Sequence, residues 1–283
     1  MQMPNAGTNA IRCRPDNEKL VTVARCVSRV RLFRCETGKQ LVMFDLHRQQ
    51  VNTIDVAYDN QQMVDVVYIN IPTELIRFDH KLNNNLVIPT NLDRLIKKYE
   101  PKLKIVYTKD YGPATKLLGS LHLENNSQTI LITVDDDCVY HRSTFAYLIG
   151  TIIHLPHHLI PAFVCEKYWV LTKEWSWRST RGKCEGFLAA YASVAYRRNY
   201  FDKDIFDYTN VPGGCVLHDD VYISGYLYRK GIRPYIIGRR GPFDIGKPWS
   251  VLKHYYETNI TVGKSNDVRS KQVCCLKYFD YFT

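Results

Sequence analysis

The stretch from Thr129 to Asp137 constrains the fold of this chain more than any other part of its 283 residues. Residues 130–134 read Ile-Leu-Ile-Thr-Val and are all apolar or β-branched, which is typical of a strand buried on both faces of a parallel sheet. Three aspartates follow at once. Because open α/β sheets bind ligands at the carboxyl ends of their parallel strands, we expect a ligand site here.

The three aspartates also indicate what kind of ligand this would be. Asp135 and Asp137 fall on one side of the extended chain, and Asp136 falls on the other. Neighbouring carboxylates repel one another, and each raises the pKa of the next unless a cation lies among them. A hard divalent ion that bridges carboxylates to phosphates would relieve that repulsion. The alternative is an acidic turn in solvent, or an N-cap for a helix that begins near Ser143.

Strand and helix patterns alternate on either side of this stretch. The sequence predicts strands over 63–72, 103–108, 159–165 and 232–237, and helices over 92–99, 114–123, 143–153 and 219–230, the first of which Thr90 and Asn91 can cap. This order predicts an α/β fold with a mainly parallel sheet flanked by helices. Residues 169–183 read as a polar, aromatic loop, and the pattern over 186–198 fits either a strand or a helix. We expect 1–60 to form a small β-rich extension in front of a domain over 61–283.

Composition narrows the partners and the compartment. The formal net charge of +10 suggests an anionic partner, but the basic residues are spread along the chain, so a nucleic-acid-binding tail is not indicated. No apolar run approaches the roughly 18 residues that a membrane span needs, and the first residues lack the apolar core of a signal peptide. The nine cysteines are scattered and form no CxxC pair. We therefore expect free thiols and a cytoplasmic location.

Three features stand in an informative order: a strand ending at Asn70-Ile-Pro72, a turn and helix with Gly112 and Lys116, and the strand that ends in Asp135, Asp136 and Asp137. Gly112 precedes Asp135 by 23 residues. This order resembles the GT-A glycosyltransferases, and especially the family 2-like group, including a subgroup found in bacteria and large DNA viruses. The resemblance covers roughly residues 63–238. For a viral source the expected location becomes the host cytoplasm.

The resemblance implies a Rossmann-like GT-A domain and a set of site residues. A nucleotide-binding half would span 61–140, an acceptor and catalytic half 141–240, and a C-terminal tail 241–283. Mn²⁺ or Mg²⁺ would be held by Asp137 with Asp135, and would neutralise the diphosphate of a sugar donor, with UDP as the expected nucleotide. The other residues expected at the nucleotide-sugar are Tyr68, Asn70, Pro72, Asp110, Gly112, Lys116, Asp135 and Asp136. On sequence alone Lys116 could equally be an exposed helix lysine.

The pair Asp219-Asp220 lies where the resemblance puts the catalytic acids. A sugar hydroxyl is a poor nucleophile at neutral pH, so a carboxylate must take its proton. The resemblance assigns this base to Asp220, leaves Asp219 open, and implies inversion at the anomeric carbon. The acceptor would be a glycan or glycoprotein. The alternative for the pair Asp219-Asp220 is an N-cap with a first-turn acid. The alternative functions for the protein are a nucleotide-sugar-binding protein without turnover and a sugar nucleotidyltransferase.

Overall fold

The computed structural model describes residues 20–25, 31–33, 40–43, 64–73, 90–135, 138–140, 144–169, 174–178, 181–238, 250–254 and 266–280. The strands are β1 Leu20–Arg25, β2 Arg31–Phe33, β3 Gln40–Met43, β4 Val66–Pro72, β5 Leu103–Thr108, β6 Ile130–Val134, β7 Cys138–Tyr140, β8 Leu159–Ala162, β9 Cys165–Trp169, β10 Glu174–Arg178, β11 Gly182–Lys183, β12 Phe187–Leu188, β13 Val194–Arg197, β14 Arg233–Ile236 and β15 Val251–His254. The α-helices are α1 Thr90–Tyr99, α2 Thr115–Leu121, α3 Thr144–His154, α4 Gly213–Val216, α5 Asp219–Arg229 and α6 Asn266–Phe279. Short 3₁₀ turns are η2 Ala190–Ala192, η3 Arg198–Tyr200 and η4 Lys203–Phe206.

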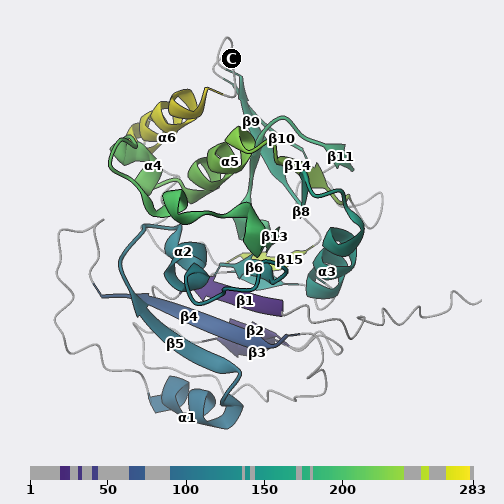
Figure 1. The fold of residues 1–283 in the computed structure, drawn as a ribbon, viewed down its shortest axis with the longest axis vertical. Coiled ribbons are helices and arrows are strands. Elements are labelled where there is room, and N and C mark those ends of the chain that lie inside the picture. The colour runs from purple at the N-terminus through teal and green to yellow at the C-terminus, as the bar shows by residue number, and fades with distance from the viewer. Residues whose placement is uncertain are drawn as a thin grey trace, which may run out of the picture.

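Eight strands form one mixed sheet in the order β11-β14-β8-β13-β6-β1-β4-β5 (Figure 1). The four strands from β6 to β5 run parallel, as do β8 and β14. The remaining pairs are antiparallel, with β13 opposed to both β6 and β8 and β11 opposed to β14. The α/β class is therefore confirmed, and the parallel arrangement holds for the half of the sheet that contains β6.

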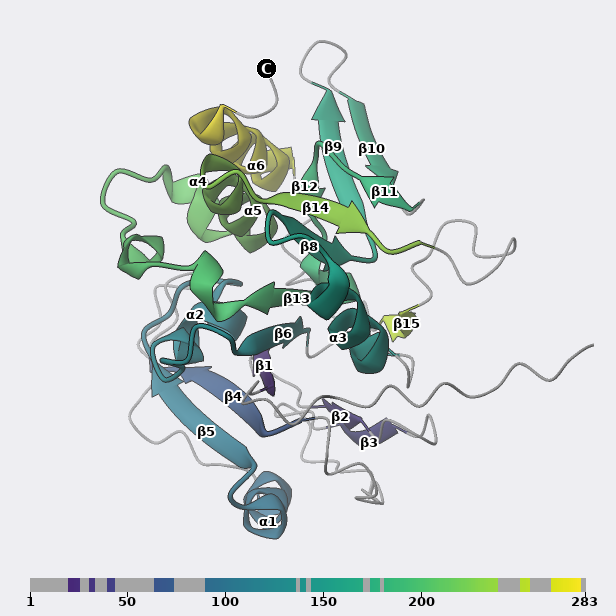
Figure 2. The same ribbon diagram turned by 45° about the vertical axis from the view of Figure 1, so that its right-hand side comes forward.

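Helices cover both faces of this sheet, as the buried strand pattern of β6 predicts. Leu131 packs into the core with residues of α2, α5 and α6, whereas Ile130 and Ile132 pack into the core with residues of α3. Figure 2 shows α2 and α3 on opposite sides of β6 and β13. In the described part of the chain, no helix combines the length and the apolar character that crossing a membrane requires.

The prediction of a separate N-terminal extension over 1–60 is wrong in one respect. β1 is a strand of the main sheet, where it pairs in parallel with β4 on one side and β6 on the other. Of the strands that the structure describes within 1–60, β2 and β3 form a two-stranded sheet apart from the main sheet. A short run such as Leu-Val-Thr-Val-Ala-Arg suits a central strand as well as a hairpin, so its sequence does not distinguish the two.

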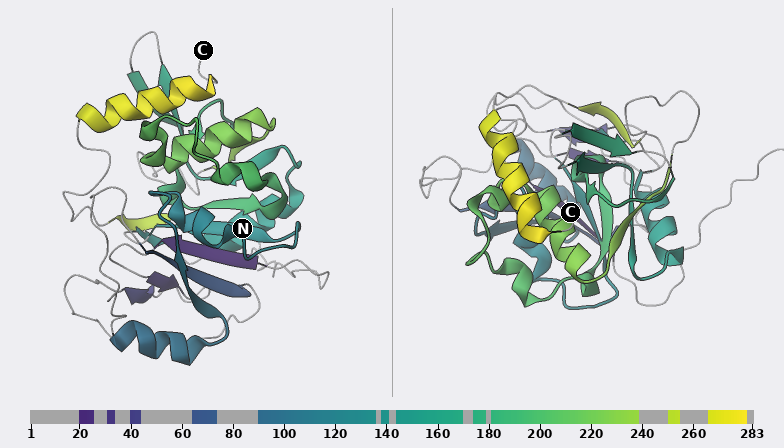
Figure 3. Two further views of the ribbon diagram at one scale, coloured as in Figure 1. Left: turned by 60° about the vertical axis from the view of Figure 1, so that its left-hand side comes forward. Right: turned by 90° about the horizontal axis from the view of Figure 1, so that it is seen from above.

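The second half differs more from expectation. The strand predicted over 159–165 is two strands, β8 and β9, and the predicted loop over 169–183 contains β10 and β11. Over 186–198 the chain forms β12, η2 and β13. β9, β10 and β12 make a small antiparallel sheet of their own. In the expected tail, α6 packs against α4 and α5 (Figure 3).

Two disulfides correct the expectation of free thiols. Cys165 pairs with Cys184, and Cys215 pairs with Cys275. The second bond joins α4, just before the start of α5, to α6. The pairs are 19 and 60 residues apart in the chain, so spacing in the sequence gave no sign of either. Among the described residues, Cys138 and Cys274 form no disulfide bond.

Candidate active site

The ammonium group of Lys116 joins three segments that are far apart in the sequence. Its Nζ lies 2.7 Å from Oδ1 of Asp135 and 2.8 Å from Oδ2 of Asp219. Lys116 belongs to α2, Asp135 follows β6, and Asp219 is the first residue of α5. The Lys116 side chain is only 5% exposed, so the alternative of an exposed helix lysine is wrong. Three of the expected motifs therefore meet at one buried cation.

The turn before α2 is shaped by its own side chains. Oδ1 of the buried Asp110 accepts hydrogen bonds from the backbone N–H of Gly112, at 2.8 Å, and from the Thr115 hydroxyl, at 3.2 Å. That hydroxyl in turn accepts from the N–H of Tyr111 at 2.8 Å. Gly112 has a φ of 60°, and a Cβ there would lie 2.0 Å from the carbonyl oxygen of Val216. Asp110 thus holds the turn, and only glycine allows it to press against α4.

Tyr68 and Asn70, expected to frame the base, lie under α2 instead. The Tyr68 hydroxyl donates to Oε1 of Glu124 at 2.7 Å, and Nδ2 of Asn70 donates to the carbonyl oxygen of Lys116 at 3.2 Å. A Cβ on Gly119 would come within 2.7 Å of the Asn70 side chain, so helix and strand are in close contact. Both side chains are buried. In this structure they fix α2, and through it Lys116, against β4.

The parallel strands do end at a common edge, as the sequence predicts. Register pairs Arg25 of β1 with Asn70, and the preceding residue of β1 with Val134, so Asn70 and Asp135 lie at the same level of the sheet. Pro72, the third residue expected near the base, lies two positions farther along β4 and is buried. The carboxyl edge of β4, β1 and β6 therefore carries the group around Lys116.

The end of β6 is anchored by a tyrosine that the sequence did not single out. The backbone N–H of Asp135 donates to the Tyr140 hydroxyl at 2.8 Å, and this hydroxyl donates to the carbonyl oxygen of Tyr191 at 2.8 Å. One strand away, the Ser193 hydroxyl donates to the carbonyl oxygen of Thr133 at 2.9 Å. These contacts depend on β7 folding back beside η2, which no local pattern reveals.

The two carboxylates at the start of α5 are directed at different groups. Asp219 contacts Lys116, as described, while Oδ1 of Asp220 accepts from the backbone N–H of Ala190 at 3.0 Å. The N-cap position of α5 belongs to His218. Neither acid is therefore the N-cap of α5, although both lie in its first turn, as that alternative expected. Lys116 of α2 thus holds Asp219, and the backbone of Ala190 in η2 holds Asp220.

Burial and charge shift the protonation of this group. Burial by itself would lower the pKa of Lys116, but Asp135, Asp219 and Asp220 outweigh it and raise the pKa well above its ordinary value. Burial, followed by repulsion from Asp219, raises the pKa of the Asp220 carboxyl well above its ordinary value. The buried phenol of Tyr196 also has a raised pKa, first through burial and then through Asp220. Lys116 is thus held as a cation, and Asp220 is the carboxyl most ready to keep or accept a proton.

The expected metal ligands fall only partly within the described residues. Asp136 and Asp137 lie outside them. Asp135 is described, and its carboxylate, 24% exposed, suits a hard divalent ion as one oxygen ligand. Within the described ranges no group of three or more histidine, cysteine, aspartate or glutamate side chains gathers to hold a metal.

No protein-family model matches this chain, and no curated protein matches it. The function is therefore inferred from the residues of the site themselves. They supply a buried cation, a carboxylate with a raised pKa, and a strand end with acidic residues, all at the carboxyl edge of parallel strands. Such a set can neutralise an anionic leaving group and remove a proton from a hydroxyl.

Proposed function

We propose that this protein is a GT-A-type glycosyltransferase that moves a sugar from a nucleotide-diphosphate donor, with UDP as the expected nucleotide, to a hydroxyl of a glycan or glycoprotein. One observation carries the proposal: Lys116 bridges Asp135 and Asp219. The three residues come from three of the motifs that the resemblance names (the turn and helix with Lys116, the strand that ends in aspartates, and the pair Asp219-Asp220), and more than 100 residues separate the first from the last. A merely structural ion pair would not require all three motifs to converge.

The first task in this reaction is to stabilise the leaving diphosphate. Lys116 brings a permanent positive charge to the sheet edge, since its pKa is raised well above the ordinary value by the surrounding carboxylates. When a phosphate enters, the ammonium can turn one of its three N–H donors towards it. A divalent ion bound by Asp137 and Asp135 would supply further neutralisation as a Lewis acid. Asp110 and Gly112 hold the turn that positions α2 for this role.

The second task is to activate the acceptor. The acceptor hydroxyl oxygen forms a bond to the anomeric carbon while the bond from that carbon to the donor phosphate oxygen breaks. The hydroxyl proton passes to the carboxylate of Asp220, which the N–H of Ala190 orients. A general base works best when its pKa lies near the working pH, and the raised pKa of Asp220 moves it in that direction. Asp219 remains paired with Lys116 and keeps the cation beside the reaction.

A single attack of this kind inverts the configuration at the anomeric carbon. The alternative chemistries differ in their products. A sugar nucleotidyltransferase would attack at phosphorus and release a diphosphate without the nucleoside, and a binding protein would release nothing.

A donor panel tests the proposal directly. The full chain is incubated with Mn²⁺ and each of several UDP-, GDP- and dTDP-sugars, and the released nucleotide is measured. We expect slow hydrolysis of one donor to the nucleoside diphosphate, and loss of this hydrolysis in Lys116→Ala and Asp135→Asn. Release of a nucleoside monophosphate with sugar 1-phosphate, which marks attack at phosphorus, or no turnover and no binding of any donor, would exclude glycosyl transfer.

A further inference from the structure

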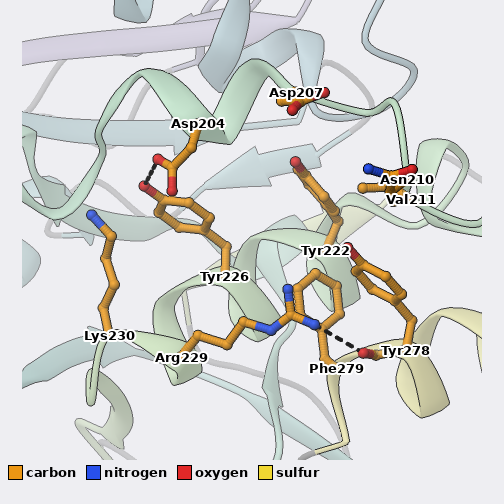
Figure 4. Close-up of a pocket in the computed structure, with 10 residues that line it drawn as sticks. All are labelled: Asp204, Asp207, Asn210, Val211, Tyr222, Tyr226, Arg229, Lys230, Tyr278 and Phe279. Atoms are coloured by element: carbon orange, nitrogen blue, oxygen red, sulfur yellow. Dashed lines mark hydrogen bonds between the residues drawn. The ribbon is translucent and has the colours of Figure 1, made fainter.

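A hollow lies beside α5, and its lining residues do not include Lys116, Asp135 or Asp219. Its walls come from α5 from Tyr222 onwards, from η4 and the loop after it, and from the end of α6 (Figure 4). The cavity has a volume of about 250 Å³. This is slightly below the roughly 300–1,000 Å³ of drug-sized pockets, so it suits a ligand of one small ring.

Aromatic side chains make the fixed part of this pocket. The Tyr226 hydroxyl donates to Oδ1 of Asp204 at 2.7 Å and accepts from the N–H of Asp202 at 3.0 Å. The Tyr222 hydroxyl donates to the carbonyl oxygen of Ile205 at 2.9 Å, and its ring stacks on another tyrosine 4.4 Å away. These bonds join α5 to η4. The aromatic walls therefore exist before any ligand enters.

The rim carries charges of both signs in equal number. Asp204 and Asp207 are exposed carboxylates, and the exposed Arg229 and Lys230 are the cations. Lys230 also forms an ion pair with Asp202, which lies outside the lining residues. In Figure 4, Lys230 and Asp204 lie on one side of the pocket, Asp207 lies on the other, and Arg229 extends between them. Arg229 donates to the carbonyl oxygen of Tyr278 at 3.0 Å, and its guanidinium lies over the Tyr278 ring.

This balance of charge selects a class of ligand. An anion would meet two carboxylates, and a cation would meet Arg229 and Lys230. A neutral polyhydroxyl ring suits the rim, because its hydroxyls accept from the cations and donate to the carboxylates. Its apolar C–H faces can pack against tyrosine side chains.

We propose that this pocket binds one ring of a neutral saccharide, at a site separate from Lys116, Asp135 and Asp219. The inference stands on the pocket alone and does not require sugar transfer at the other site. If transfer does occur there, the pocket would hold a distant ring of the same glycan or of another one.

Ligand-observed NMR and calorimetry on the full chain test this. The probes are glucose, galactose, mannose, N-acetylglucosamine, maltose and lactose, with glucuronate and inorganic phosphate as charged comparisons. We expect at least one neutral sugar to bind, and Asp204→Asn and Arg229→Gln each to weaken it about tenfold or more, because each removes a hydrogen bond to a charged group. Glu185→Gln is the matched control: it neutralises an exposed acid outside the lining residues and should change nothing.

Two comparisons make the result decisive. UDP with Mn²⁺ should not displace the sugar, since the two sites differ. Thermal melts establish that each variant is folded, and Asp207→Asn provides a second rim change that keeps the hydrogen bond its carboxylate accepts from Thr209. The proposal is overturned if no neutral sugar binds, if the rim variants bind as the wild type does, if UDP competes, or if glucuronate or phosphate binds more tightly.

Discussion

Replacing Lys116 by methionine isolates the ion pairs that hold the candidate active site together. Methionine keeps the length and the apolar stem but removes the charge that lies 2.7 Å from Asp135 and 2.8 Å from Asp219. The two carboxylates then remain close together without a counter-ion. Removing one partner of a buried ion pair costs about 3–5 kcal/mol. Because the Asp135 side chain is 24% exposed, water would compensate part of the loss, and we expect the lower end, about 3 kcal/mol.

Thermal unfolding of the purified chain measures this loss. At about 2–4 °C per kcal/mol for a chain of this size, the midpoint should fall by roughly 6–12 °C. The pH must be chosen with the sign in mind. The pKa of Lys116 is raised in the folded state, so its contribution is complete below about pH 10 and is lost only as pH rises through the raised value. Measurement at pH 7 therefore captures all of it.

A matched control tests whether burial, and not the ion pair alone, makes the loss of Lys116 costly to stability. Lys97 and Asp93 form an ion pair of the same 2.7 Å length on the surface of α1, with side chains 73% and 46% exposed. Lys97→Met should leave the midpoint unchanged within error. The double variant Lys116→Met with Asp219→Asn should be more stable than Lys116→Met alone, because it removes one of the stranded charges. Equal midpoints for wild type and Lys116→Met, or no gain in the double variant, would refute the buried bridge.

Three further outcomes follow from the site. Asp220→Asn should reduce sugar transfer by about 10²–10⁴ while donor binding persists. Because the pKa of Asp220 is raised in the folded state, its contribution to stability is complete only below about pH 4 and is lost as pH rises. Near pH 7, Asp220→Asn should therefore be more stable than the wild type, and a lower melting midpoint for the variant would contradict this. Gly112→Ala should destabilise more than Gly231→Ala, since both glycines have positive φ but only at Gly112 would the Cβ meet backbone, a difference that chemical denaturation would resolve. Asp137→Ala should abolish the Mn²⁺ dependence of UDP binding in calorimetry, and metal-independent UDP affinity in the wild type would argue against a bound ion.

Local patterns were sufficient for the elements that carry the site. The strand predicted over 103–108 matches β5, the apolar run 130–134 matches β6, and the helix predicted over 219–230 matches α5 to within one residue. Each has a strong local signature: short runs rich in apolar and β-branched residues for the strands, and first-turn acids with a glycine stop for the helix. The meeting of their motifs at one edge also followed, because parallel strands place their carboxyl ends together.

What the sequence could not provide depends on distant contacts. The hydroxyl of Tyr140 supports Asp135 only because β7 folds back, and the N–H that Asp220 accepts from belongs to η2, thirty residues earlier. Tyr68 and Asn70 were expected at the base, but their side chains contact Glu124 and α2. The sequence does not tell whether a strand residue faces a helix or a ligand. The disulfides likewise depend on distant packing: Cys215–Cys275 joins α4 to α6, and Cys165–Cys184 joins β9 to the segment between β11 and β12.

The place of β1 between β4 and β6 has a kinetic consequence. The strand β1 is synthesised before both of its partners, and one of them, β6, ends only at Val134. At about 5–20 residues per second, a nascent β1 would wait several seconds or more for that partner. Contacts between such distant segments also slow folding of the finished chain, because a long loop must close first. During that interval β1 is an unpaired edge, and pairing with other chains competes with completion of the sheet.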